Sequence, residues 1–122
     1  MGKFTLRKHE RLKKELWIQE LFQKGSSFHL YPFRVITLPH PDTSGSGHQM
    51  LVSVSSRNFK KAPDRNRVKR RVREAYRLNK HQLLAEPKWL IAYIYKAKEI
   101  LPSAIIHEKL TATLAKIGAN AK

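Results

Sequence analysis

Residues 57–80, RNFKKAPDRNRVKRRVREAYRLNK, constrain the fold most, because they combine a helical apolar pattern with a very high density of positive charge. The segment contains 11 Lys or Arg residues and two acids, Asp64 and Glu74. Asp64 is a suitable N-cap, so we expect a helix from there to about Asn79. At about 100° per residue its apolar residues fall on one side, which must face a core. They are Val68, Val72, Ala75 and Tyr76, with Leu78 at the edge.

The opposite side of this helix is cationic. Its residues share a sector of about 60°, and they are Asn66, Arg70, Arg73 and Arg77, flanked by Arg67 and Lys69. Like charges three or four residues apart destabilise a helix by a few tenths of a kcal/mol per pair, and Arg65 opposes the helix dipole in the first turn. One interpretation of this cationic side is an ordinary solvent-exposed face with no ligand. Because repeated violations of local rules usually mark function, we interpret the strip as a phosphate-binding surface.

The whole chain has the same charge imbalance. Its 122 residues fit one domain, 1–122, and 25 basic against 9 acidic residues give a formal net charge of +16. Such charge opposes compaction, so we expect a polyanionic partner, nucleic acid first and a membrane surface second. A membrane-surface helix needs a broad apolar face free for lipid, whereas the apolar side here is narrow. No apolar run approaches the roughly 18 residues of a spanning helix. The chain has no cysteine, which suits a cytoplasmic protein.

Helices and strands are expected to alternate around the basic helix. Before it we expect a flexible basic arm at 1–7, a helix at 9–24, a strand at 28–38, a flexible loop at 39–48 and a strand at 49–56. Gly25 would end the first helix, and Pro32 favours an edge position or a bulge. In the second strand Met50, Val52 and Val54 share one face. The two strands and their loop predict an antiparallel hairpin.

Two further elements are expected after the basic helix. KWLIAYIYK, residues 88–96, is almost continuously apolar and predicts a strand buried on both faces. Pro102 and Ser103 would begin a last helix that ends at Gly118. Its buried stripe is Ile106, Leu110, Thr113, Leu114 and Ile117. The order is helix, strand, strand, helix, strand, helix, with an additional short strand considered near Phe59.

RNRVKRRVREAYR, residues 65–77, strongly resembles the signature of the bacterial ribonuclease P protein subunit. The resemblance covers nearly the whole chain: RLKKELWIQELFQKG is similar to the first helix of that family, LVSVSSRNFKKA to the strand and turn before the signature, and WLIAYIYK to the last strand. It implies an α+β fold, a two-layer α/β sandwich related to a ribosomal-protein domain, in the order α-β-β-(β)-α-β-α. It also implies a left-handed βαβ crossover, against the usual right-handed rule.

The resemblance implies a cytoplasmic, non-catalytic protein subunit of a ribonucleoprotein endonuclease that removes the 5′ leader from precursor tRNA. The RNA subunit and its Mg²⁺ ions would hydrolyse the phosphodiester, and neither a catalytic residue, a metal site on the protein nor another protein partner is implied. The residues expected to contact the catalytic RNA are Arg65, Asn66, Arg67, Lys69, Arg70, Arg73 and Arg77. The alternative for Asn66 is a local capping amide.

The leader is expected in a cleft between the first helix and the sheet. Its candidate residues are Phe22, Ile36, Ser53, Ser55 and Arg57. An apolar floor with a basic rim suits single-stranded RNA, in which each stacked base contributes about 1–3 kcal/mol. The alternative for Phe22 is core packing. Many relatives carry two lysines where this chain has Ser56 and Arg57.

The sequence leaves two alternative functions. A nuclease in its own right would need clustered ligands or acid–base pairs, but the histidines are scattered, at positions 9, 29, 40, 48, 81 and 107, and most are expected to be exposed. Cleavage by the RNA-free protein would favour that function. The other alternative is a general RNA-binding or ribosomal protein with the same fold. The choice of RNA partner would distinguish such a protein from a ribonuclease P subunit.

Overall fold

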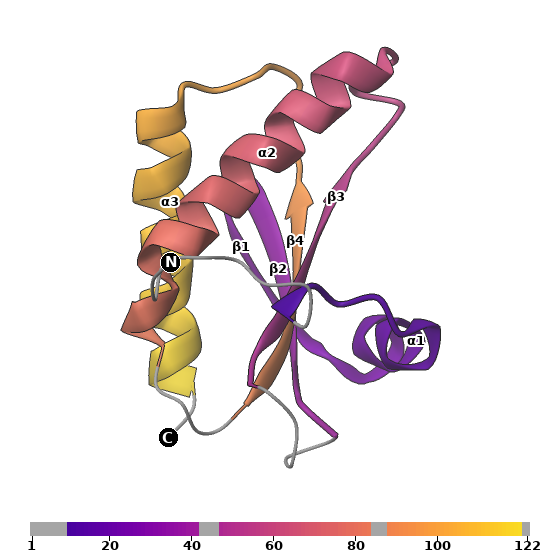
Figure 1. Ribbon diagram of the computed structural model, residues 1–122, viewed down its shortest axis with the longest axis vertical. Helices are drawn as coiled ribbons and strands as arrows, with labels where there is room; N and C mark the ends of the chain where they lie inside the picture. The colour runs from indigo at the N-terminus through magenta and orange to yellow at the C-terminus, as the bar shows by residue number, and fades with distance from the viewer. Residues whose placement is uncertain (1–9, 42–46, 84–87, 121–122) are drawn as a thin grey trace.

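The computed structural model describes residues 10–41, 47–83 and 88–120. In chain order the elements are α1 (Glu15–Lys24), β1 (Ser26–Leu30), β2 (Phe33–Pro39), β3 (Gln49–Val54), α2 (Ala62–Asn79), a 3₁₀ turn η2 (Lys80–Gln82), β4 (Trp89–Tyr95) and α3 (Ser103–Asn120). Figure 1 shows α2 and α3 together on one face of the sheet and α1 on the other. The predicted α+β class is confirmed. None of the helices in these ranges is long and apolar enough to cross a membrane.

The four strands form one sheet in the order β1-β2-β4-β3. β2 is antiparallel to both β1 and β4, whereas β3 is parallel to β4. The expected hairpin between 28–38 and 49–56 is therefore wrong, because β4 lies between those strands. β4 has no charged residue and is largely buried along its length, so the centre of the sheet suits it best. The connection from β3 through α2 to β4 is left-handed (Figure 1), as the resemblance implied.

The expected strand at 28–38 is in fact the hairpin of β1 and β2. Tyr31 and Pro32 form its turn, and the peptide bond between them is cis. Proline has no N–H to donate to a strand ladder, so Pro32 separates two strands instead of forming a bulge in one. Its carbonyl oxygen accepts a 2.7 Å hydrogen bond from the Lys96 N–H. This contact joins the hairpin turn to the end of β4.

The first helix begins at Glu15 and not at residue 9 as expected. The preceding residues run beside β3, where Arg11 forms a parallel bridge with Met50 and the Leu12 N–H donates to the Met50 carbonyl at 2.8 Å. Leu12 is buried there. Pairing with the free edge of β3 has therefore prevailed over the helical spacing of the leucines. We call residues 10–13 the N-terminal strap.

Gly25 ends α1, as expected, and also lets the helix approach the sheet closely. A Cβ at this position would lie 2.7 Å from Cγ2 of Ile36 and would overlap the Leu21 carbonyl. The backbone at Gly25 is extended, with φ −69°. Glycine is therefore favoured here by close packing and not by a left-handed backbone conformation. α1 can rest on β2 only because this side chain is absent.

Two further boundaries differ from expectation, and one short strand does not form. α2 begins at Ala62, two residues before the expected start at Asp64, and Lys61 is its N-cap. Asp64 lies in the first turn together with Pro63, whose fixed φ suits the start of a helix. α3 runs past Gly118 to Asn120. No strand forms at Phe59, which is buried in the turn before α2 with its N–H donating to the Ser55 carbonyl at 3.1 Å.

The main core lies between the sheet and the α2–α3 pair, and the predicted burial there is confirmed. Every residue expected on the apolar sides of α2 and α3 is buried except Leu78, the edge residue. The Tyr93 hydroxyl lies 3.0 Å from the Thr113 hydroxyl, and burial raises the pKa of Tyr93 and of Tyr76. A smaller core under α1 contains Leu12, Leu21, Ile36, Leu90 and Ala92. Because the apolar side of α2 is committed to the main core, its cationic side faces outward.

Candidate nucleic-acid interface

The predicted RNA-contacting residues all lie on the polar side of α2, with different degrees of exposure. Asn66, Arg67 and Arg70 are exposed, whereas the others are half-buried. Asn66 lies in the second turn of α2, so it does not cap the helix. Its role in contacting RNA stays a prediction, as do those of its neighbours.

Arg65 is held by the turn that leads into α2. Its Nη1 donates to the Phe59 carbonyl at 2.7 Å and to the Lys60 carbonyl at 3.0 Å. Both acceptors belong to the connection after β3, so one side chain fixes the approach to the helix. The remaining donors of its guanidinium are not used in these bonds. Arg65 therefore has a structural role that the sequence pattern did not reveal.

Two other arginines of α2 have partners within the protein. The Arg77 Nε lies 2.5 Å from the Glu74 Oε1, and this exposed pair lowers the pKa of Glu74 and raises that of Arg77. Arg71 Nη1 donates to the Leu101 carbonyl at 2.7 Å, which connects α2 to the residues before α3. The strip thus consists of partly anchored side chains. Its cations without such a bond to the described part of the chain are Arg67, Lys69, Arg70 and Arg73.

The cleft residues are only partly brought together. Phe22 is 45% exposed on α1, so the alternative of core packing is wrong. Ile36 is 2% exposed and packs beneath α1, so it cannot line an open cleft in this structure. Ser53 is half-buried on the α1 face of β3, and Ser55 and Arg57 are exposed just beyond that strand.

A hollow at this end of the sheet contains residues that the sequence reasoning missed. With a cavity volume of about 390 Å³, it is lined by Ser55, Ser56, Arg57, Asn58, Ile94, Tyr95 and Lys96. Ile94 pairs with Ser53 in the sheet and so shares its face. The period-two alternation of β4 could have located Ile94, because it places Ile94 on the opposite face from Tyr93 and Tyr95.

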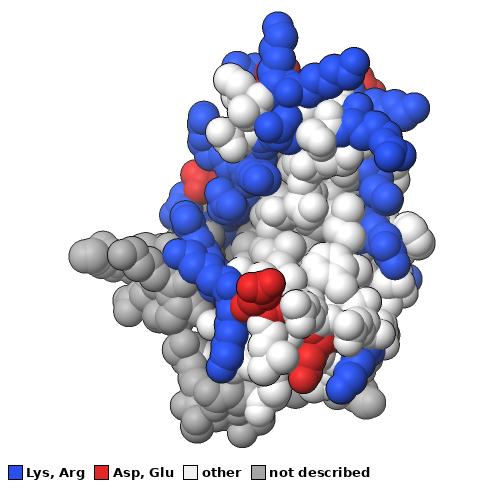
Figure 2. Space-filling model, turned by 90° about the vertical axis from the view of Figure 1, so that its right-hand side faces the viewer, with Lys and Arg blue, Asp and Glu red and all other residues white. Residues whose placement is uncertain are grey.

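The face that carries α1 has an uncharged centre with a basic margin. Figure 2 shows Lys and Arg side chains gathered where β3 leads into α2 and along both sides, with an uncharged strip between them and few acids. An apolar strip bordered by cations can hold bases on its floor and phosphates at its edges. The arrangement therefore offers a single strand a path next to the cationic side of α2.

The histidines in the described ranges do not belong to a metal-binding cluster. No three His, Cys, Asp or Glu residues there are placed to hold a metal ion. His40, expected in a flexible loop, is 6% exposed and packs its ring 4.6 Å from that of Trp17. His48 Nδ1 accepts a 3.0 Å hydrogen bond from the Trp89 N–H. These two histidines therefore contribute to packing around α1 and β4.

Comparison with known proteins connects this geometry to one family. A sequence model of the family described as Ribonuclease P matches residues 6–118. The ribonuclease P protein component of Porphyromonas gingivalis is 48% identical over 80 residues, which cover 66% of this chain and 58% of that relative. The corresponding component of Chlorobium phaeobacteroides is 43% identical over 82 residues, 65% of this chain and 56% of the relative. The alignments thus span less than two thirds of these relatives.

Solved structures show the same fold over most of the chain. The RNase P protein of Staphylococcus aureus superposes with a TM-score of 0.74 and 27% sequence identity, covering 94% of this chain and 100% of that one. The RNase P protein of Thermotoga maritima gives a TM-score of 0.71 and 25% identity, covering 88% and 96% of the two chains. The similarity therefore includes both the cationic helix and the sheet face beside it.

Proposed function

The chain belongs to the ribonuclease P protein family, and from this premise we propose that it is the non-catalytic protein subunit of a ribonuclease P. It would bind the catalytic RNA through α2 and the 5′ leader of precursor tRNA through the face that carries α1. The RNA, with its Mg²⁺ ions, would remove the leader and generate the mature 5′ end in the cytoplasm. The observation that carries the proposal is the outward cationic side of α2, in which Arg67, Arg70 and Arg73 have no acidic partner among the described residues.

The chemistry of α2 suits a folded RNA. Each guanidinium can donate two parallel hydrogen bonds to phosphate oxygens, and the exposed Asn66 can both donate and accept at a ribose hydroxyl or a base edge. Because the apolar side of α2 is buried, RNA can approach without disturbing the core. Binding would also relieve the repulsion among the arginines. The Mg²⁺ ions of the reaction are assigned to the RNA subunit, where they would activate water and stabilise the leaving oxygen.

The leader would follow the uncharged strip on the α1 face. Phe22 offers an exposed ring for stacking, and Arg57 and Lys96 border the hollow at the end of the sheet. Contacts with the leader distinguish precursor from mature tRNA, which has no leader. The protein would thus raise the affinity for substrate over product.

The α2 assignment is tested by Arg70→Ala, because Arg70 is exposed and its side chain bonds to none of the described residues. We expect about a tenfold loss of affinity for the RNA subunit, equivalent to about 1.4 kcal/mol, and a salt slope reduced by about 0.7–0.9. Lys116→Ala removes the same charge from α3 and should change neither quantity. Unchanged affinity and slope in Arg70→Ala would remove α2 from the interface.

The leader assignment is tested by Phe22→Ala. With the protein bound to its RNA subunit, we expect weaker binding of precursor tRNA and unchanged binding of mature tRNA. An equal loss for both would show that Phe22 does not contact the leader. A parallel assay compares precursor cleavage by the RNA subunit at low Mg²⁺ with and without the protein. No stimulation, or equal affinity for unrelated RNA, would instead favour a general RNA-binding protein.

A further inference from the structure

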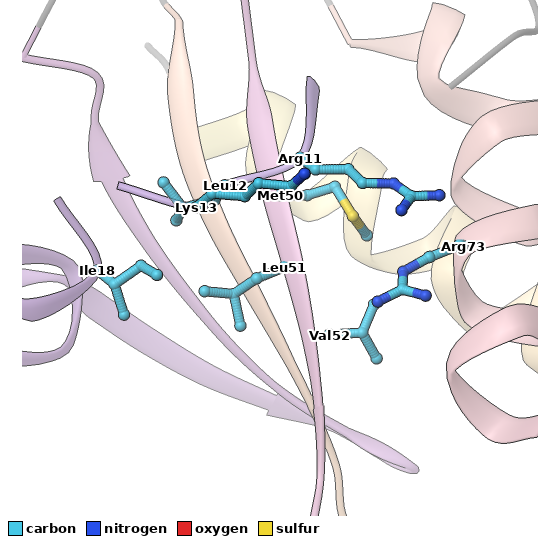
Figure 3. Close-up of a pocket in the computed structure, with 8 residues that line it drawn as sticks. All are labelled: Arg11, Leu12, Lys13, Ile18, Met50, Leu51, Val52 and Arg73. Carbon is cyan, nitrogen blue, oxygen red and sulfur yellow. The ribbon is translucent and has the colours of Figure 1, made fainter. Parts of the chain in front are cut away.

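A second hollow lies between the N-terminal strap, β3 and α2. Its cavity volume is about 260 Å³, and it is lined by Arg11, Leu12, Lys13, Ile18, Met50, Leu51, Val52 and Arg73. In Figure 3 Arg11 and Arg73 extend along the same side of β3, one from the strap and the other from α2. Two arginines separated by more than 60 positions in the sequence therefore meet at one place.

The positive charge in this hollow is not balanced by any acid in the part of the chain that the structure describes. No acid among the described residues lines it. The acids adjacent in sequence to Arg11 and Arg73 are Glu10 and Glu74, and they pair with Lys80 at 2.6 Å and with Arg77 at 2.5 Å. Neither the Arg11 nor the Arg73 guanidinium has a hydrogen-bond or ion-pair partner among the described residues. Partial burial lowers the pKa of Arg73, and repulsion from Arg11 lowers it further. The attraction of an anion in the hollow would offset both unfavourable effects.

The two arginines are held in this arrangement by their backbones. The strap is fixed by the Arg11–Met50 bridge and by the buried Leu12 side chain. α2 is fixed by Val72, which is fully buried one residue before Arg73. Because these anchors are independent of the guanidinium groups, repulsion does not drive the elements apart. Such preorganisation reduces the entropic cost of binding a ligand between them.

We propose that this hollow binds a single phosphate group of the RNA backbone, held jointly by Arg11 and Arg73 with Lys13 at its margin. This inference rests on the proposed function and extends the RNA-binding surface from α2 across the edge of β3 to the strap. Two guanidinium forks match the two non-bridging oxygens of a phosphodiester. The side chains of Met50 and Val52 supply an apolar floor for the neighbouring ribose.

The proposal has a thermodynamic consequence for the strap. A phosphate that contacts both arginines connects residues 10–13 to α2, so RNA binding should also stabilise the pairing of the strap with β3. By linkage, the factor by which RNA binding stabilises the paired strap equals the factor by which the paired strap raises RNA affinity. The N-terminal strap then belongs to the binding surface and is more than an edge cover for the sheet.

A double-mutant cycle measures whether the two arginines share one phosphate. Arg11→Ala and Arg73→Ala should each lower the affinity for the RNA subunit by about tenfold. The double variant should lose about 10- to 20-fold, because either single change already disrupts the shared contact. A loss of about 100-fold, the product of the single effects, would mean separate phosphates and would overturn the proposal.

Lys14→Ala is the matched control for Arg11→Ala. Lys14 is an exposed cation three positions away whose Nζ lies over the ring of Trp17, and it does not line the hollow. We expect little change in RNA affinity for this control. If Arg11→Ala behaves like the control while Arg70→Ala weakens binding, the shared phosphate is wrong but the proposed function stands. If neither Arg70→Ala nor Arg73→Ala affects RNA binding, the proposed function itself fails.

Thermal unfolding separates a binding role from a structural one. Because Arg11 makes only a backbone bridge and repels Arg73, Arg11→Ala should leave the melting temperature of the free protein unchanged or raise it. A lower melting temperature together with weaker RNA binding would show that Arg11 stabilises the fold and would overturn the proposal. Arg11→Lys retains the charge without the fork and should recover part of the affinity.

Titration with inorganic phosphate distinguishes a free anion from the RNA backbone as the ligand. The amide resonances of Met50 and Leu51 should shift in a saturable manner in the native protein and in Lys14→Ala, but not in Arg11→Ala or Arg73→Ala. Shifts that persist in the arginine variants would indicate general screening and no built site. Saturable phosphate binding combined with an additive RNA cycle would assign the hollow to a free anion instead of RNA.

Discussion

Arg65→Ala tests whether an arginine on the proposed RNA-binding side of α2 also stabilises the fold. Arg65→Ala removes two hydrogen bonds from a charged donor to backbone carbonyls, at 2.7 Å and 3.0 Å. Hydrogen bonds of charged groups contribute about 1.5–3 kcal/mol when buried, but Arg65 is half-buried and the Lys60 bond is exposed. We therefore expect a destabilisation of about 1–2 kcal/mol. For a chain of this size that corresponds to roughly 3–8 °C in melting temperature.

The assay is thermal and urea unfolding of the free protein, with Arg67→Ala as the matched control. Arg67 is exposed and its side chain makes no hydrogen bond within the described part of the chain, so its removal should leave stability unchanged or raise it by reducing repulsion. Arg65→Lys should not restore stability, because an ammonium cannot reproduce the fork to both carbonyls. If Arg65→Ala and Arg67→Ala unfold at the same temperature, Arg65 does not hold the turn and the reasoning is wrong.

Three further outcomes are expected. Gly25→Ala should destabilise the protein by about 1–3 kcal/mol in urea unfolding, because its Cβ has no room between α1 and β2; an unchanged midpoint would contradict this close packing. Tyr93→Phe should cost about 1 kcal/mol, since the hydroxyl 3.0 Å from Thr113 is lost in the core, and calorimetry against Thr113→Val and the double variant should show coupling. The pKa of Glu74 is lowered chiefly by its hydrogen bond with Arg77, so this pair stabilises the fold above the unfolded carboxyl pKa and is lost as the pH falls through the folded value. Glu74→Gln should therefore be less stable than the native protein at neutral pH, with a difference that disappears in acid.

Local sequence patterns predicted an element correctly where the residues on one of its sides could only be buried or only be exposed to solvent. The cationic and apolar sides of α2, the stripe of α3 and the buried run of β4 were all correctly assigned, because periodicity and apolarity depend on nearby residues alone. Phe22 and Ile36 show the limit of this reasoning. Both were assigned to one cleft, yet Phe22 is exposed and Ile36 lies beneath α1, because the helix covers only part of the sheet face.

By itself the sequence determined that α2 must bury one side and present arginines on the other, that β4 must be enclosed, and that the chain resembles one RNA-binding family. The tertiary structure alone decided that β4 lies between β2 and β3, that Arg65 holds a turn, and that Arg11 and Arg73 meet across the edge of β3. The physical reason for this division is the distance along the chain between the residues that interact. Helical sidedness arises from residues three or four apart, whereas strand order and converging side chains depend on backbone hydrogen bonds between segments far apart in the chain.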